Sequence, residues 1–133
     1  MSTPPSKFLH ILLWIVQGVL ALAFGTIGIN KLTTSEADLI QQSGELIEKY
    51  GVGLIRFIGI SEVLGALGLI LPAALRILPV LTPLASLGLA MIMVLATALH
   101  ASKGEPVYTQ IAFLLLTVFV VWGRGSKARI QAK

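Results

Sequence analysis

The sequence contains no cysteine, and this absence removes whole classes of chemistry. Without a thiol there is no disulfide, no thiolate ligand for a metal and no dithiol relay for electrons. Histidine is almost as scarce, since His10 and His100 are the only two. Because they fall at opposite faces of the predicted membrane domain, they cannot share one haem or one metal ion. With no Ser-His-Asp grouping and no phosphate-binding glycine-rich motif, the chain is not expected to be an autonomous enzyme, and we predict no catalytic residue and no metal ligand.

Charge is the second scarcity. Only 12% of the 133 residues are charged, whereas 56% are hydrophobic and the mean hydropathy is +0.90. A soluble domain of this size could not hide so much apolar surface in one core. Four apolar stretches are each long enough to cross about 30 Å of hydrocarbon. We therefore predict an all-α integral membrane four-helix bundle, one domain over 1–133, with helices at about 8–29, 54–71, 80–99 and 106–122.

Small residues are spaced so that the first two membrane helices can pack closely. Gln17 lies near mid-membrane in the first helix, and we interpret it as an interhelical hydrogen-bonding residue in preference to a ligand contact. Pro72 lacks an N–H and is expected to end the second helix. The small residues form one stripe in each helix: Gly18, Ala21, Gly25 and Gly28 in the first, and Gly59, Gly65 and Ala66, on the same face as Glu62, in the second.

The segment at 36–50 is too polar to span a membrane and has the pattern of an amphipathic helix. Ser35 is suited to cap its start and Gly51 to terminate it. Such a helix either lies flat in the membrane interface or caps the mouth of the bundle. Its apolar face consists of Leu39, Ile40, Leu46, Ile47 and Tyr50.

The basic residues predict the orientation of the bundle. Four spans place both termini and the elbow at 72–79 on one side of the membrane, and the amphipathic helix in the first loop on the other. By the positive-inside rule the termini are cytoplasmic, and we expect a multi-pass protein of the inner (plasma) membrane with 36–50 in an extracytoplasmic loop. The basic residues behind the net charge of +4 lie beside the helix ends, so we interpret them as topology signals and expect no nucleic-acid partner. The terminal side holds Lys7, Arg76, Arg124, Lys127, Arg129 and Lys133, and the other holds Lys31, Lys49, Arg56 and Lys103.

Glu62 is the leading functional candidate, because an ionisable residue at such depth costs about 2.5–3.5 kcal/mol on insertion scales. It should face the bundle interior, where it either pairs with Arg56 of its own helix or with Lys31, His100 or Gln110 of another, or binds a proton. For Arg56 and His100, contact with lipid head groups is an equal alternative. If all four membrane helices contribute to one outer polar pocket, its residues are Asn30, Lys31, Arg56, Glu62, His100 and Gln110.

Several motifs resemble those of the DoxX-like family of small membrane proteins. They are GINKL at 28–32, RFIGISEVLG at 56–65, the Leu-Pro pair at 71–72 and His100. The resemblance covers most of the chain. It implies a four-helix bundle and, for named members, association with quinone-linked redox enzymes or with membrane-protein assembly. It also implies that Lys31, Arg56, Glu62 and His100 are the family's polar positions, while the lack of cysteine separates this chain from thiol-oxidising relatives.

Three functions follow as hypotheses. In the first, the outer pocket binds a small amphipathic molecule, and a quinone is the one cofactor suggested. In the second, the chain is an accessory or assembly subunit, for example the membrane subunit of a quinone-linked oxidoreductase, with a protein partner or as a homo-oligomer in the bilayer. In the third, Glu62 couples protons to the transport of a small molecule.

Overall fold

The computed structural model describes residues 6–133 of the chain, and within them it is helical and has no strand. Four segments are long and apolar enough to cross a membrane: α1, α3, α4, and α5 together with the π-helical turn η1. The all-α four-helix membrane bundle predicted from the sequence is therefore confirmed. The elements are α1 (Lys7–Thr33), α2 (Glu36–Tyr50), α3 (Val52–Leu75), α4 (Leu81–Ser102), α5 (Tyr108–Trp122) and η1 (Gly123–Lys127).

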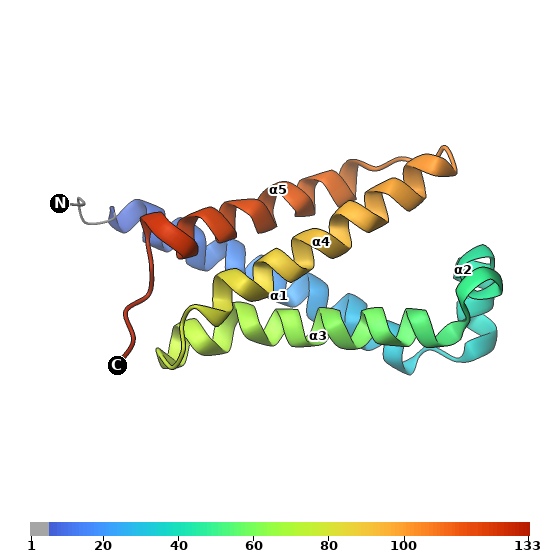
Figure 1. The fold of residues 1–133 in the computed structure, drawn as a ribbon, viewed down its shortest axis with the longest axis horizontal. Helices are drawn as coiled ribbons and strands as arrows, with labels where there is room; N and C mark the ends of the chain where they lie inside the picture. Colours follow the sequence, from blue (N-terminus) through green and yellow to red (C-terminus); the bar gives the residue numbers. More distant parts are fainter. Residues whose placement is uncertain (1–5) are drawn as a thin grey trace.

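The bundle has two distinct ends (Figure 1). α2 and the α4–α5 turn lie at one, called here the α2 end. The start of α1, the α3–α4 elbow, η1 and the C-terminal tail lie at the other, the tail end. Between them α1 packs chiefly on α3, α4 packs on both α3 and α5, and α5 returns to α1. The start of α1 and the C-terminal tail therefore lie at the same end of the bundle as the elbow, which agrees with the predicted topology.

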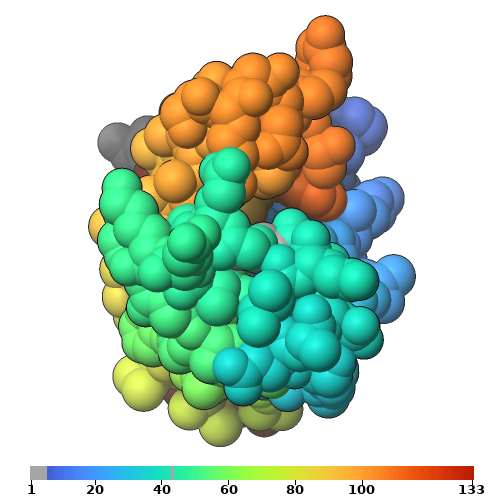
Figure 2. All heavy atoms as spheres, turned by 90° about the vertical axis from the view of Figure 1, so that its right-hand side faces the viewer, coloured from blue at the N-terminus to red at the C-terminus, as the bar shows by residue number. Residues whose placement is uncertain are grey.

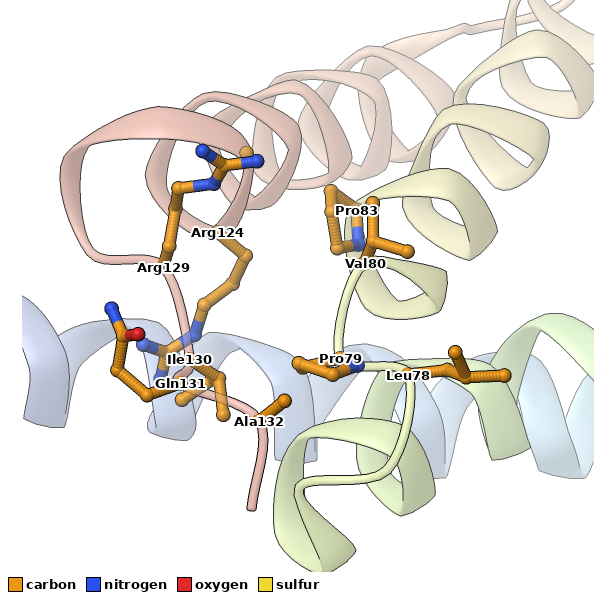
Figure 3. Close-up of a pocket in the computed structure, with 10 residues that line it drawn as sticks. Leu78, Pro79, Val80, Pro83, Arg124, Arg129, Ile130, Gln131 and Ala132 are labelled. Carbon is orange, nitrogen blue, oxygen red and sulfur yellow. The ribbon is translucent and has the colours of Figure 1, made fainter.

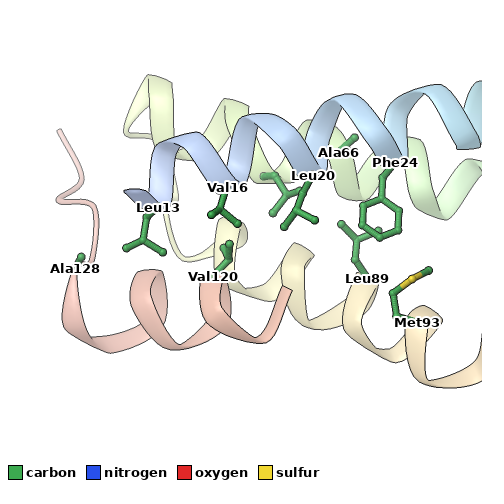
Figure 4. Packing of buried hydrophobic residues seen from close by; sticks show 10 residues of the cluster. Leu13, Val16, Leu20, Phe24, Ala66, Leu89, Met93, Val120 and Ala128 are labelled. Atoms are coloured by element: carbon green, nitrogen blue, oxygen red, sulfur yellow. The ribbon is translucent and has the colours of Figure 1, made fainter. Parts of the chain in front are cut away.

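The core is a column of apolar side chains between α1, α3, α4 and α5 (Figure 4). Phe24 is fully buried in it, and its ring centre lies 5.5 Å from that of Phe113. Many other large apolar side chains, such as Leu22 and Met91, point outward, as expected of helices whose outer surface contacts lipid tails. The buried cluster is Leu13, Val16, Leu20, Phe24, Ala66, Leu69, Leu89, Met93, Val120 and Ala128.

The amphipathic helix forms over the predicted residues. The Ser35 hydroxyl accepts the N–H of Asp38 at 3.3 Å, and Gly51 ends the helix at a φ of 87°, a value that favours glycine. Leu39 is buried, whereas Ile40 and Tyr50 are about half exposed. α2 packs against α3 at the end of the bundle.

Pro72 does not end the second membrane helix, so this part of the sequence prediction is wrong. α3 continues past it to Leu75. A proline has no N–H, so the carbonyl four residues earlier, that of Gly68, loses its partner within the helix. The hydroxyl of Thr82, fully buried at the start of α4, donates to that carbonyl at 2.9 Å. A neighbouring helix therefore satisfies the backbone group that the proline leaves open, which lets the membrane helix run on.

We predict that Thr82→Val destabilises the bundle, because the Gly68 carbonyl would be buried without a partner. The expected loss is about 1–3 kcal/mol in the free energy of unfolding, measured by thermal or denaturant unfolding in detergent. The matched control is Thr97→Val, since the Thr97 hydroxyl donates to the Met93 carbonyl within its own helix. A loss in the Thr97 variant as large as that in the Thr82 variant would contradict this role for Thr82.

Candidate functional site

Glu62 and Lys31 form an ion pair between α3 and α1. The Lys31 Nζ lies 2.6 Å from the Glu62 Oε1, and the two side chains are 30% and 1% exposed. The carboxylate therefore faces the bundle interior. The sequence left Arg56, Lys31, His100 and Gln110 open as its partner, and the structure pairs it with Lys31. Replacing one member of such a buried pair lowers the stability of the fold, because the remaining charge is then buried without a counter-charge.

Two glycines bring the helices close enough for this pair to form. A methyl group at Gly28 would lie 2.7 Å from the carbonyl oxygen of Gly59. A methyl group at Gly59 would lie 2.8 Å from the Cβ of Lys31. Both distances are shorter than real contacts allow, so neither position tolerates a side chain without a shift of the backbone. Each glycine stands three residues before a member of the ion pair, and therefore on nearly the same face of its helix.

Arg56 holds the end of α1. Its Nη1 donates to the carbonyl oxygens of Lys31 and Thr34, each at 2.8 Å. Carbonyls in the last turn of a helix have no intrahelical partner, and a cation there also suits the helix dipole. Arg56 thus fixes the backbone from which the Lys31 side chain projects, and it acts as a positioning residue.

A cavity of about 210 Å³ opens at the α2 end, where the surface is hollowed between α2 and the end of α4 (Figure 2). Its walls are apolar side chains of α3 and α4, and its rim carries three groups that can be cationic. At this rim the Nδ1 of His100 lies 3.2 Å from a Glu105 oxygen, and Lys103 lies 3.8 Å from Glu45. Residues lining the cavity include Ile55, Ile58, Ile92, Ala96 and Leu99 on the walls, and Lys31, Gln42, His100, Lys103 and Glu105 at the rim.

The six residues predicted to form one outer pocket do not all meet. Lys31 and His100 line the cavity, and Glu62 and Arg56 lie behind Lys31 and hold it in place. Asn30 is exposed and Gln110 is half-buried, and neither is among the described residues that line the cavity. Sequence reasoning missed Gln42 and Lys103, which α2 and the end of α4 contribute.

A second polar cluster, centred on Arg124, lies at the tail end. Arg124 is only 3% exposed, and its Nε donates to the Gln17 Oε1 at 2.7 Å. Its Nη1 contacts the Nδ1 of His10 at 3.0 Å and donates to the carbonyl of Ala128 at 2.8 Å. Since arginine can only donate, the Nδ1 of His10 must accept, which places the proton of the neutral ring on Nε2.

Gln17 joins this cluster to α3. Its Nε2 donates to the carbonyl of Leu69 at 2.6 Å, so the predicted interhelical hydrogen bond is confirmed. The sequence alone identifies Arg124 only as one of the basic residues that predict the topology. The available signal was the glycine on either side of it: a methyl group at Gly123 would lie 2.6 Å from Leu13, so η1 packs directly on α1 and carries Arg124 inward.

No curated protein and no solved structure matches the chain. The sequence model of the DoxX-like family matches residues 15–123, a range that includes the Lys31–Glu62 pair, Arg56 and His100. The match spans most of the four membrane helices described above. This multi-pass membrane chain therefore belongs to the DoxX-like family.

Proposed function

We propose that the chain is a membrane accessory subunit whose cavity at the α2 end binds a small amphipathic molecule, with a quinone as the leading class. The observation that carries the proposal is the cavity itself, which combines apolar walls with donors at its rim. Lys31 and Lys103 can each donate to a carbonyl oxygen, and so can His100. Such a combination of an apolar body and a few convergent polar groups is typical of ligand sites.

The size of the cavity suits the head of such a molecule and leaves its tail outside. At about 210 Å³ it is smaller than the roughly 300–1,000 Å³ of sites that enclose whole drug-sized ligands. An apolar groove of about 440 Å³ between α3 and α4 shares Ile92 with the cavity. Its other residues include Leu64, Gly65 and Gly88, so an apolar tail can lie along it within the membrane.

Glu62 contributes to this function indirectly, through Lys31. The pair holds the Lys31 ammonium group between α1 and α3 at the edge of the cavity. Transport driven by Glu62 has no comparable support, because the carboxylate is 1% exposed and lies outside the cavity lining. An accessory role beside a quinone-linked oxidoreductase is consistent with membership of the DoxX-like family.

We predict that Ala96→Trp, which places an indole in the cavity, weakens binding of decylubiquinone, a quinone with a short apolar tail. The purified protein should show a saturable rise in thermal midpoint with this probe, and the variant should need at least about tenfold more of it. Organic molecules that copurify with the wild type, detected by mass spectrometry, should be depleted in the variant.

The control is Ala98→Trp, two residues along α4 at an exposed position. It adds the same indole outside the cavity and should bind and retain the same molecules as the wild type. Equal probe binding and equal copurification in both variants would show that the cavity is not the binding site.

We also propose that the tail end faces the cytoplasm, on the support of its six basic residues. Because the chain has no cysteine, single cysteines at Gln41 on α2 and at Ser126 in η1 can be labelled without background. In intact cells an impermeant maleimide should label Gln41→Cys directly and Ser126→Cys only after permeabilisation. The reverse pattern would invert the orientation, and labelling of both in intact cells would contradict a membrane between them.

A further inference from the structure

We propose that the tail end carries a second site, which binds an anionic phosphate group against Arg124 and Arg129. The group belongs either to the head of an acidic phospholipid or to a soluble phosphate compound. This site lies at the opposite end of the bundle from the cavity beside α2 and does not depend on the function proposed for that cavity.

Arg124 is a buried cation whose hydrogen-bond acceptors are all neutral. They are the side chains of Gln17 and His10 and the carbonyl oxygens of Ala128 and, at 3.4 Å, His10. A guanidinium stays protonated in proteins, so hydrogen bonds to neutral groups leave its charge in place. A buried charge without a counter-charge is costly, and an anion held near Arg124 therefore lowers the electrostatic cost of burying that charge.

No acidic side chain is available at this end to supply that counter-charge. All six acidic residues of the chain lie on α2, at Glu62 in α3 or at Glu105 in the α4–α5 turn. The ion pairs within residues 6–133 lie at those places too, and none involves a residue of the tail end. The electrostatic potential there is therefore positive over a wide surface, which attracts anions. The basic residues of the tail end are Lys7, Arg76, Arg124, Lys127, Arg129 and Lys133.

A cavity of about 350 Å³ lies beside Arg124, between the C-terminal tail and the α3–α4 elbow (Figure 3). The elbow contributes an apolar wall that includes Pro79 and Val80, and Arg124 and Arg129 supply the cationic groups. The volume is within the range of sites that hold small ligands. The side chains of Arg129 and Arg124 extend in opposite directions from the tail end (Figure 3), so the exposed Arg129 is the residue whose planar N–H fork is free to donate to phosphate oxygens. Arg124, held by its protein partners, adds its positive charge to the wall of the cavity.

The tail is held in place across this basic region. The Arg76 Nε donates to the Gln131 carbonyl at 2.6 Å, and the Lys133 N–H donates to the Arg76 carbonyl at 3.0 Å. A second hollow of about 460 Å³ on the other side of the tail is lined by His10, Arg76 and, again, Arg129. Arg129 therefore faces both spaces, and the tail lies between them as a fixed wall of the site.

The depth of the site matches that of lipid head groups. Trp122, about half exposed, directly precedes η1, and the ring of Trp14 lies 5.4 Å from the Arg124 guanidinium carbon. Tryptophan is enriched at the level where head groups meet the hydrocarbon. Basic pockets between membrane helices at that level bind anionic head groups, which makes an acidic phospholipid a natural source of the phosphate.

The test is the thermal midpoint of the full chain in dodecyl maltoside. It is titrated with dioleoyl phosphatidylglycerol, with dioleoyl phosphatidylcholine, and with sodium phosphate against sodium chloride at equal ionic strength. The proposal predicts a saturable rise with phosphatidylglycerol, with sodium phosphate or with both, and none with phosphatidylcholine or sodium chloride. A rise with phosphatidylglycerol alone assigns a lipid head group, and a rise with sodium phosphate assigns a site open to soluble phosphate compounds.

Two charge-matched variants decide whether the site is specific. Arg129→Gln changes an exposed residue that lines both spaces, and it should weaken apparent affinity about ten- to hundredfold. Lys127→Gln removes the same charge from an exposed residue outside the lining of either space, and it should bind as the wild type does. The absence of a saturable rise, an equal response to phosphatidylcholine, or an equal loss in the two variants would each overturn the proposal.

Discussion

The close contact between α1 and α3 is the constraint on which the α2 end of this molecule depends. Gly28 and Gly59 leave no room for a methyl group between the helices, and this approach lets Lys31 reach Glu62 at 2.6 Å. In lipid, apolar side chains gain little from leaving the solvent, so helices associate through close packing and through polar contacts. Here Gly28 and Gly59 allow the close packing, and the Lys31–Glu62 ion pair supplies the polar contact. Arg56 then fixes the end of α1, and the Lys31 ammonium group is held at the edge of the cavity.

The same rule, that a polar group inside the membrane must find a partner on another helix, governs the rest of the bundle. The Thr82 hydroxyl donates to the α3 carbonyl that has no partner within its helix because of Pro72. The Ser86 hydroxyl donates to the carbonyl of Thr117 on α5. Gln17 links α1 to α3 and to Arg124. These polar groups link α1 with α3, α3 with α4, α4 with α5 and η1 with α1. The two proposed binding sites lie where such groups reach the ends of the bundle.

The features that depend on residues close together in the sequence were predicted correctly. Apolar length gave the four spans, and the polar residue Ser35 and Gly51 marked the two ends of α2. The burial of Glu62 followed from its energetic cost at depth. Features that depend on distant residues were missed. At Pro72 the open Gly68 carbonyl is satisfied by Thr82 of the next helix, and the buried Arg124 donates to Gln17, more than a hundred positions earlier. The grouping of site residues failed for a similar reason, since the rotation of each helix about its axis decided that Lys31 and not Asn30 reaches the cavity.

The measurement that tests this account most directly is a double-mutant cycle on Lys31→Met and Glu62→Leu, followed by unfolding in detergent. Each single change should lower the free energy of unfolding, by up to about 3–5 kcal/mol, because it leaves a charge unpaired. Lys31→Met should be the more damaging, since Glu62 is 1% exposed and Lys31, at 30%, can turn towards water. The account predicts that the double variant is more stable than the Lys31→Met protein, because the buried carboxylate has gone together with its partner. Strictly additive losses would contradict it, because they would mean that the two side chains do not stabilise the bundle through each other.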